Sequence, residues 1–141
     1  MTEDELLKQF GLTPDSNALD EIRAILQDET AREHKSQGDG DTEVMKLCCV
    51  QLFSAACLDD ILRIWAAKSA SFDAAVSIDV QLLCGPGLSE TKAFLSSDDR
   101  PEATAALSRI LECESAGDFA GFSPSEWLGY YKQYYADTPE D

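Results

Sequence analysis

The residue types that most often do chemistry are few in this chain, and their spacing matches no catalytic or metal-binding pattern. His34 is the only histidine, and no second histidine or cysteine stands near it at ligand spacing. A histidine-activated serine or cysteine would therefore have to come from a distant part of the chain. The glycines at 38–40 lie in an acidic stretch without lysine, and Pro86 lacks the N–H that a phosphate loop would use. We predict no catalytic residue, no metal site and no cofactor, with His34 at the surface.

The five cysteines are the next candidates, and their pattern favours buried thiols. Their number is odd and no Cys-x-x-Cys occurs, so neither a disulfide framework nor a thiolate metal site is indicated. Each cysteine stands among apolar residues, where a free thiol behaves as a small hydrophobe. A redox role for the adjacent pair Cys48 and Cys49 is the alternative interpretation.

A polar set lies between residues 59 and 81, inside the least charged part of the chain. Asp59 and Arg63 are four residues apart, as are Asp73 and Ser77, so each pair can share a helix face. Ordinary pairing on solvated faces is the simpler interpretation, whereas carboxylates buried together could do acid–base work. If a pocket exists here, its predicted lining is Trp65, Lys68, Asp73 and Asp79.

Aromatic residues crowd the last helical segment, over residues 127–135. A stripe of Trp127, Tyr131 and Tyr134 is enough to dock this segment on a core, which leaves Tyr130 and Tyr135 pointing elsewhere. Packing of a terminal helix explains such residues most simply. Tyrosine and tryptophan are also enriched at protein interfaces, so the candidate interface comprises Trp127, Tyr130, Tyr134 and Tyr135.

The charge balance restricts the partners of the chain. It has 27 acidic against 11 basic residues, a formal net charge of -16, and most of the excess lies in residues 1–43 and 101–141. Such a field repels nucleic acid and anionic lipid, because phosphate contacts require lysine and arginine. A basic protein would be attracted instead. No run of about 18 apolar residues suggests a membrane span, and the acidic first residues do not resemble a signal peptide, so we expect a cytoplasmic protein.

The elements that would position these residues are helical from end to end. Thr2 and Glu5 form a capping box for a first helix that Gly11 ends. Thr13-Pro14 predicts the start of a second helix, which fades where apolar residues vanish over 29–35, and 36–41 is a loop. Residues 44–57 are apolar nearly all round, as in a buried central helix, and acidic residues at 59–60 open the helix that follows.

Residues 75–84 fit two patterns. Apolar side chains at alternate positions are typical of a strand, but a helical stripe is also present, made of Phe72, Val76, Val80 and Leu83. No partner strand occurs elsewhere, and an isolated strand leaves its backbone groups unsatisfied, so we predict a helix. Further helices are expected from 89 to 95, from about 101 and from 124 to 136, the last capped by Ser123 and Pro124.

These signals predict an all-α fold of about seven or eight short helices, packed as antiparallel helical hairpins in one domain, 1–141. Its predicted parts are acidic N-terminal helices and a loop (1–43), a helical core (44–136) and a frayed tail (137–141). From Glu43 onward, helix lengths and turn placement resemble the stacked helical hairpins of HEAT and armadillo proteins. The resemblance covers about two-thirds of the chain and implies no functional residues, because no repeat consensus recurs.

Three hypotheses about function follow. The first is a non-enzymatic module that binds another protein through an acidic face and exposed aromatics, in one version an inhibitor or immunity-type protein that occludes a basic enzyme. The second is an enzyme or small-molecule binder that uses a polar pocket built from residues 59–81. The third is a structural homodimer with the aromatic C-terminal helix buried between copies.

Overall fold

The computed structural model describes residues 1–136, and these residues form an all-helical domain, as the sequence predicts. The helices are α1 (Glu3–Phe10), α2 (Ser16–Lys35), α3 (Thr42–Ala55), α4 (Ile61–Lys68), α5 (Phe72–Ser77), α6 (Leu88–Ser96), α7 (Pro101–Ser115) and α8 (Pro124–Ala136), with 3-10 helices η1 (Leu58–Asp60) and η2 (Val80–Cys84). The predicted tail, 137–141, lies outside the described residues.

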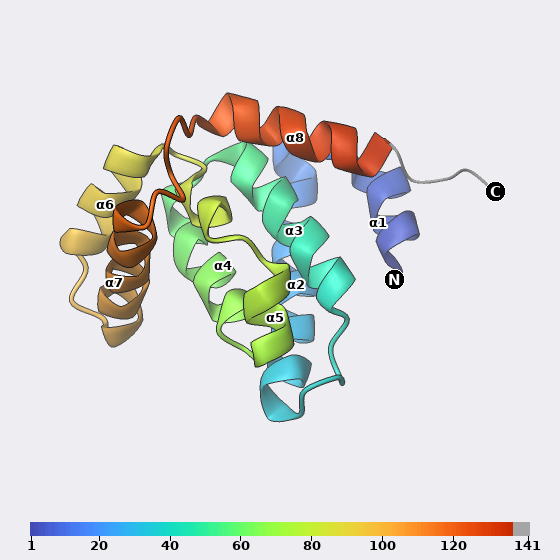
Figure 1. Ribbon diagram of the computed structural model, residues 1–141. Helices are drawn as coiled ribbons and strands as arrows, with labels where there is room; N and C mark the ends of the chain where they lie inside the picture. The colour runs from blue at the N-terminus through green and yellow to red at the C-terminus, as the bar shows by residue number, and fades with distance from the viewer. Residues whose placement is uncertain (137–141) are drawn as a thin grey trace.

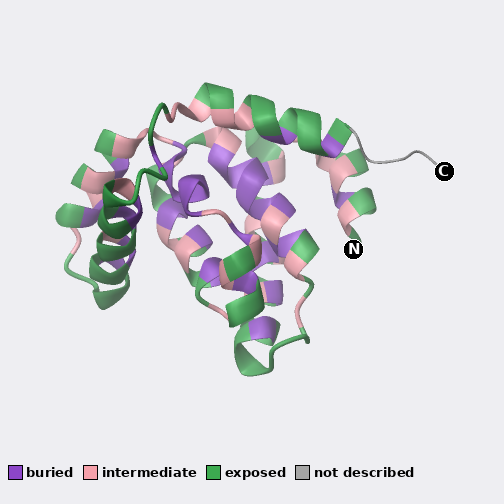
Figure 2. Cartoon of the chain, viewed as in Figure 1, coloured by how far each residue is buried: buried purple, intermediate pink, exposed green. Residues whose placement is uncertain are grey.

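The central helix is α3, which contacts α1, α2, α5, η2 and α8 (Figure 1). Its residues from Val44 to Phe53 are buried on nearly every side, apart from Lys46, which confirms the expectation for this apolar segment. Figure 2 shows the buried residues gathered along α3 and the inner faces of its neighbours. The antiparallel pair α6 and α7 packs on the other side of α4. None of the helices described for residues 1–136 is long and apolar enough to cross a membrane.

Local side-chain caps begin several of these helices. The Thr2 hydroxyl accepts from the Glu5 N–H at 3.2 Å, and Gly11 ends α1 with a positive φ of 66°. The Ser123 hydroxyl caps α8 in the same way. The prediction that Thr13-Pro14 starts the second helix is wrong. The carboxylate of Asp15 accepts from the Ala18 N–H at 3.0 Å, so α2 begins at Ser16.

The polar half of α2 remains helical to Lys35 because it has tertiary partners. Glu33 is buried, and its carboxylate accepts hydrogen bonds from the Gly38 N–H (2.9 Å), the Gly40 N–H (3.1 Å) and the Ser71 hydroxyl (2.6 Å). The loop that follows α2 therefore folds back over the last turns of the helix. A side chain at Gly40 would come within 2.6 Å of the backbone oxygen of Glu29, so this close approach requires glycine.

The segment predicted as one helix over 75–84 is divided. α5 ends at Ser77, residues 78–79 are extended, and the chain re-enters a 3-10 helix at Val80. The buried amino group of Lys68 donates to the carbonyls of Ala75 and Ile78, which later amides would use in a continuous helix. Ile78 lies in the core. The predicted stripe is wrong for Phe72 and Val76, which are exposed, and right for Val80 and Leu83, which are buried.

Candidate functional site

The four side chains predicted to line one pocket do not share one: Lys68 and Asp79 lie near each other, and Trp65 and Asp73 line two different hollows. Trp65 is half-buried on α4 and faces a trough described below. Lys68 is buried, and desolvation lowers the pKa of its amino group. Asp73 is exposed on α5. Asp79 accepts a hydrogen bond from the hydroxyl of Tyr131 in α8. Lys68 and Asp79 thus hold the fold together rather than lining a cavity with Trp65 and Asp73.

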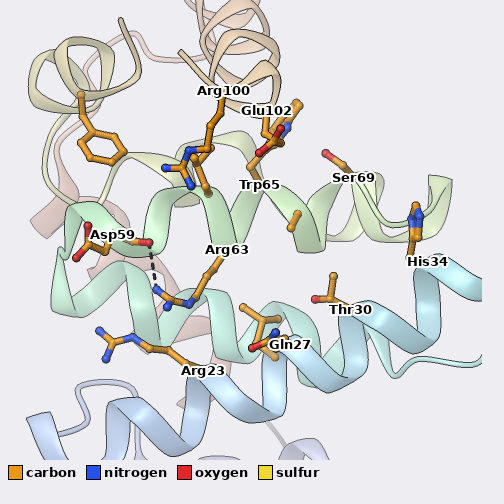
Figure 3. A pocket seen from close by; sticks show the side chains of 14 residues that line it. Arg23, Gln27, Thr30, His34, Asp59, Arg63, Trp65, Ser69, Arg100 and Glu102 are labelled. Carbon is orange, nitrogen blue, oxygen red and sulfur yellow. Dashed lines mark hydrogen bonds between the residues drawn. The ribbon is translucent and has the colours of Figure 1, made fainter. Parts of the chain in front are cut away.

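A trough of about 820 Å³ runs along α4, with α2 on one side and the α6–α7 pair on the other (Figure 3). Leu62, Trp65 and Phe94 supply its apolar surface. Its polar lining includes three arginines, Arg23, Arg63 and Arg100, together with Asp59, Glu102 and His34. His34 is exposed, as expected.

A buried ion network adjoins this trough, because two of its members, Arg23 and Arg63, belong to the lining. The side chain of Asp60 is 1% exposed, and Arg23 of α2 binds it in bidentate fashion, from Nε at 2.8 Å and from Nη2 at 2.9 Å. Arg63 adds a third bond from Nη1 at 2.9 Å. Arg63 also donates to the backbone oxygen of Asp59, so its carboxylate partner is Asp60 and not Asp59. The network joins α2 to α4 and keeps the buried carboxylate fully paired.

The ionisable groups of the trough have the following partners. The Asp60 carboxylate is already occupied by two guanidinium groups, and the exposed imidazole of His34 is not hydrogen-bonded to a nucleophile within residues 1–136. The same residues contain no group of three or more histidine, cysteine, aspartate and glutamate side chains placed to hold a metal ion. The exposed guanidinium groups of Arg63 and Arg100 and the apolar surface beside them can bind an anionic ligand.

Carboxylates gather at another end of the molecule, around a hollow of about 630 Å³ between the N-terminus, the loop after α2 and α5. We call this region the acidic surface, and its exposed carboxylates are Asp39, Asp41, Glu43 and Asp73. Burial and the neighbouring charge of Glu43 raise the pKa of Glu3, which adjoins the region. The acidic surface therefore concentrates negative charge contributed by segments far apart in the sequence.

An apolar pair adjoins the acidic surface. Phe72 is 76% exposed and Val76 is 68% exposed, and they stand four residues apart on α5. Side chains at this spacing share one helix face. Asp73 follows Phe72 directly and lines the acidic hollow. We call Phe72 and Val76 the α5 pair. Sequence reasoning missed it because the helical stripe placed both residues in the core.

The aromatic face of α8 differs in part from the prediction. Tyr131 and Tyr135 are buried, whereas Tyr130 and Tyr134 are 56% and 48% exposed. The docking stripe thus follows the i, i+4 spacing of Trp127, Tyr131 and Tyr135, in place of the predicted Trp127, Tyr131 and Tyr134. Tyr135, a predicted interface residue, belongs to the core. Tyr130 and Tyr134 remain available on the solvent side.

The thiols are free in the described structure, and four of the five are buried. Burial raises the pKa of Cys48 and of Cys84 to about 12, and also raises that of Cys49. These groups are therefore protonated at neutral pH and weakly nucleophilic. Cys57 is the partly exposed one. The buried-thiol interpretation is confirmed for the other four.

No protein-family model, curated protein or solved structure matches this chain.

Proposed function

We propose that this chain is a non-enzymatic module that binds a basic protein, with the α5 pair and the acidic surface as its contact. The observation that carries the proposal is the exposure of Phe72 and Val76 beside carboxylates. Two large apolar side chains on one face of a helix gain from burial against a partner. The carboxylates around them would meet lysine and arginine there. An inhibitor that occludes a basic enzyme is one protein of this kind.

Charge supports a basic partner. With a net charge of -16, the chain attracts a positively charged protein over several ångströms and speeds its association, mainly at low ionic strength. The acidic surface gives that attraction a local direction. Charge would raise the association rate and orient the partner, and burial of the apolar side chains would slow dissociation of the complex.

The exposed rings of α8 are less suited to the same partner. Lys46 Nζ lies 4.9 Å from the centre of the Tyr134 ring and 5.8 Å from that of Tyr131. Positive charge therefore accompanies this aromatic face, and it would oppose a basic surface. We place the contact at α5 because its two exposed apolar side chains adjoin a hollow with four exposed carboxylates, which outnumber the one arginine there, Arg32. Tyr130 and Tyr134 serve as a comparison surface.

The contribution of the α5 pair follows from its exposure. Complete burial of a phenylalanine or valine side chain is worth about 1.5–3 kcal/mol, and Phe72 and Val76 retain most of their surface for a partner. Together they should contribute about 3 kcal/mol, roughly a 100-fold change in Kd. Replacing exposed side chains changes the free energy of unfolding by only about 0.5 kcal/mol, so binding and folding can be separated.

The test begins with affinity capture by the immobilised chain from lysate of the cells that produce it, at about 50 mM and about 500 mM salt. The captured protein is identified, purified and titrated calorimetrically against wild type, Phe72→Ser/Val76→Ser and Leu111→Ser. Leu111 is an exposed leucine on α7 and serves as the matched control. We expect a basic partner that is captured at the lower salt concentration and binds the α5 double variant roughly 100-fold more weakly.

Three results would overturn the proposal. One is a partner without a basic surface, and another is a purified partner whose affinity is the same for wild type and Phe72→Ser/Val76→Ser. The third is the absence of a direct binder at low salt. A decrease in affinity that occurs in Tyr130→Ser/Tyr134→Ser and not in the α5 double variant would show that the contact lies on α8, and so would refute its placement on α5.

A further inference from the structure

The trough along α4 is an exception in an acidic chain. Of the five arginines in the sequence, three line this single hollow. Arg23 is engaged by Asp60 and Asp20, and so it has mainly a structural part. Arg63 and Arg100 are different, because both are exposed. The trough therefore presents two guanidinium groups to solvent, beside the carboxylates of Asp59 and Glu102, in a chain whose net charge is -16.

Both exposed arginines retain hydrogen-bond donors. The bonds of Arg63 to Asp59 and Asp60 come from Nη1, and within residues 1–136 its Nε and Nη2 are not bonded. Arg100 binds Asp98 through Nε and Nη2, which leaves its Nη1. A guanidinium group with free N–H donors recognises carboxylate, sulfonate or phosphate oxygens.

The apolar part of the trough lies beside these donors. Figure 3 shows Arg100 projecting from the start of α7 toward Trp65, and Arg63 projecting from α4 toward α2. The partly exposed Trp65 and Phe94 rings can stack against a flat apolar body. Thr30 also belongs to the lining.

From this placement we propose that the trough binds a small organic anion with a flat, aromatic body. The negative group accepts hydrogen bonds from Arg63 or Arg100, which enter the trough from different helices, and the ring system lies along Trp65 and Phe94. The volume of about 820 Å³ is within the range of ligand sites. This site is separate from the α5 pair, so it does not depend on the proposed function.

The test uses two fluorescent probes of nearly the same shape, anionic 1-anilinonaphthalene-8-sulfonate and neutral N-phenyl-1-naphthylamine. Wild type should bind the sulfonate saturably at one site. Arg63→Gln/Arg100→Gln should weaken sulfonate binding at least about tenfold and leave binding of the neutral probe unchanged. Lys8→Gln makes a charge change of the same sign on α1, away from the trough, and should alter neither titration.

A second measurement locates the probe. The chain has two tryptophans, so in a Trp127→Phe background the emission comes from Trp65. The sulfonate probe should quench this emission with the same saturation curve. Arg100→Gln alone removes exposed side-chain bonds to Asp98 and keeps the bond from the backbone N–H of Arg100 to the same carboxylate, and circular dichroism checks that each variant is folded. Unchanged sulfonate affinity in the arginine variants, equal loss of both probes, or unquenched Trp65 emission would overturn the proposal.

Discussion

Tyr131 and Tyr135 are two buried hydroxyl groups on one face of α8, and only one of them has a partner. The Tyr131 hydroxyl donates to the carboxylate of Asp79. The Tyr135 hydroxyl is buried without a hydrogen-bond partner within the described residues. Phenylalanine removes the same atom at either position and preserves the ring. The two variants therefore separate the worth of one hydrogen bond from that of the packing they share.

The expected effects have different sizes. A hydrogen bond to a charged group contributes about 1.5–3 kcal/mol to stability, and the partly exposed Asp79 can recover some hydration, so Tyr131→Phe should cost about 2 kcal/mol. An unpartnered buried hydroxyl is unfavourable. Tyr135→Phe should therefore leave the free energy of unfolding unchanged or raise it by up to about 1 kcal/mol.

Urea unfolding followed by circular dichroism measures both values. At a slope of about 2 kcal/mol per molar urea, Tyr131→Phe should lower the midpoint by about 1 M. Tyr135→Phe should leave the midpoint in place or raise it. An equal decrease in the free energy of unfolding of the two variants, or a larger decrease in Tyr135→Phe, would refute the stabilising role assigned to the hydrogen bond between Tyr131 and Asp79.

The pH dependence gives an independent check on burial. Burial raises the pKa of both tyrosines above the usual value of 10.0, and the bond to Asp79 raises that of Tyr131 further. Above pH 10.0 the unfolded chain loses protons that the folded chain retains, so stability is present below that pH and falls as pH rises. Each phenylalanine variant should lose stability less steeply than wild type in this alkaline range.

Two further predictions concern Glu33 and the thiols. The hydroxyl of Ser71 and the N–H groups of the following loop hold the pKa of Glu33 below its ordinary value of 4.5. The ionised Glu33 side chain therefore adds its full contribution to the free energy of unfolding above pH 4.5, and this contribution is lost as pH falls through the lower pKa of the folded state. The difference in urea midpoint between wild type and Glu33→Gln should therefore become smaller as pH is lowered. A difference that is constant from neutral to strongly acidic pH would contradict this. For the thiols, Ellman's reagent at about pH 8 should label Cys57 rapidly and the other four only on unfolding; rapid labelling of the Cys48–Cys49 pair would refute their burial.

The helix starts that sequence reasoning predicted correctly depend on short-range chemistry. Thr2 and Ser123 each accept from an amide three residues ahead, so the whole interaction is contained in the local sequence. Asp15 does the same, but it competed with the more familiar Thr13-Pro14 signal. The apolar run of α3 likewise predicted its burial without knowledge of any neighbour.

The errors occur where distant residues decide the outcome. Lys68 binds the carbonyls of Ala75 and Ile78, which are seven and ten residues away, and the sequence does not show these bonds, which accompany the end of α5 at Ser77. The trough depends on Arg23 and Asp60, which are 37 residues apart. Of this network, only the spacing of Asp60 and Arg63 on one helical turn was visible in the sequence.

The sequence by itself determined the class of the fold, the acidity of the molecule and the burial of α3, because periodicity, charge and local caps are properties of short segments. The tertiary structure alone decided which polar residues meet. It placed Trp65 and Asp73 in two different hollows, and it brought Arg100 into the trough that Trp65 lines. The physical reason is that local sequence sets which side chains share a helix face, whereas the packing of the other helices decides which face is buried and which residues it meets.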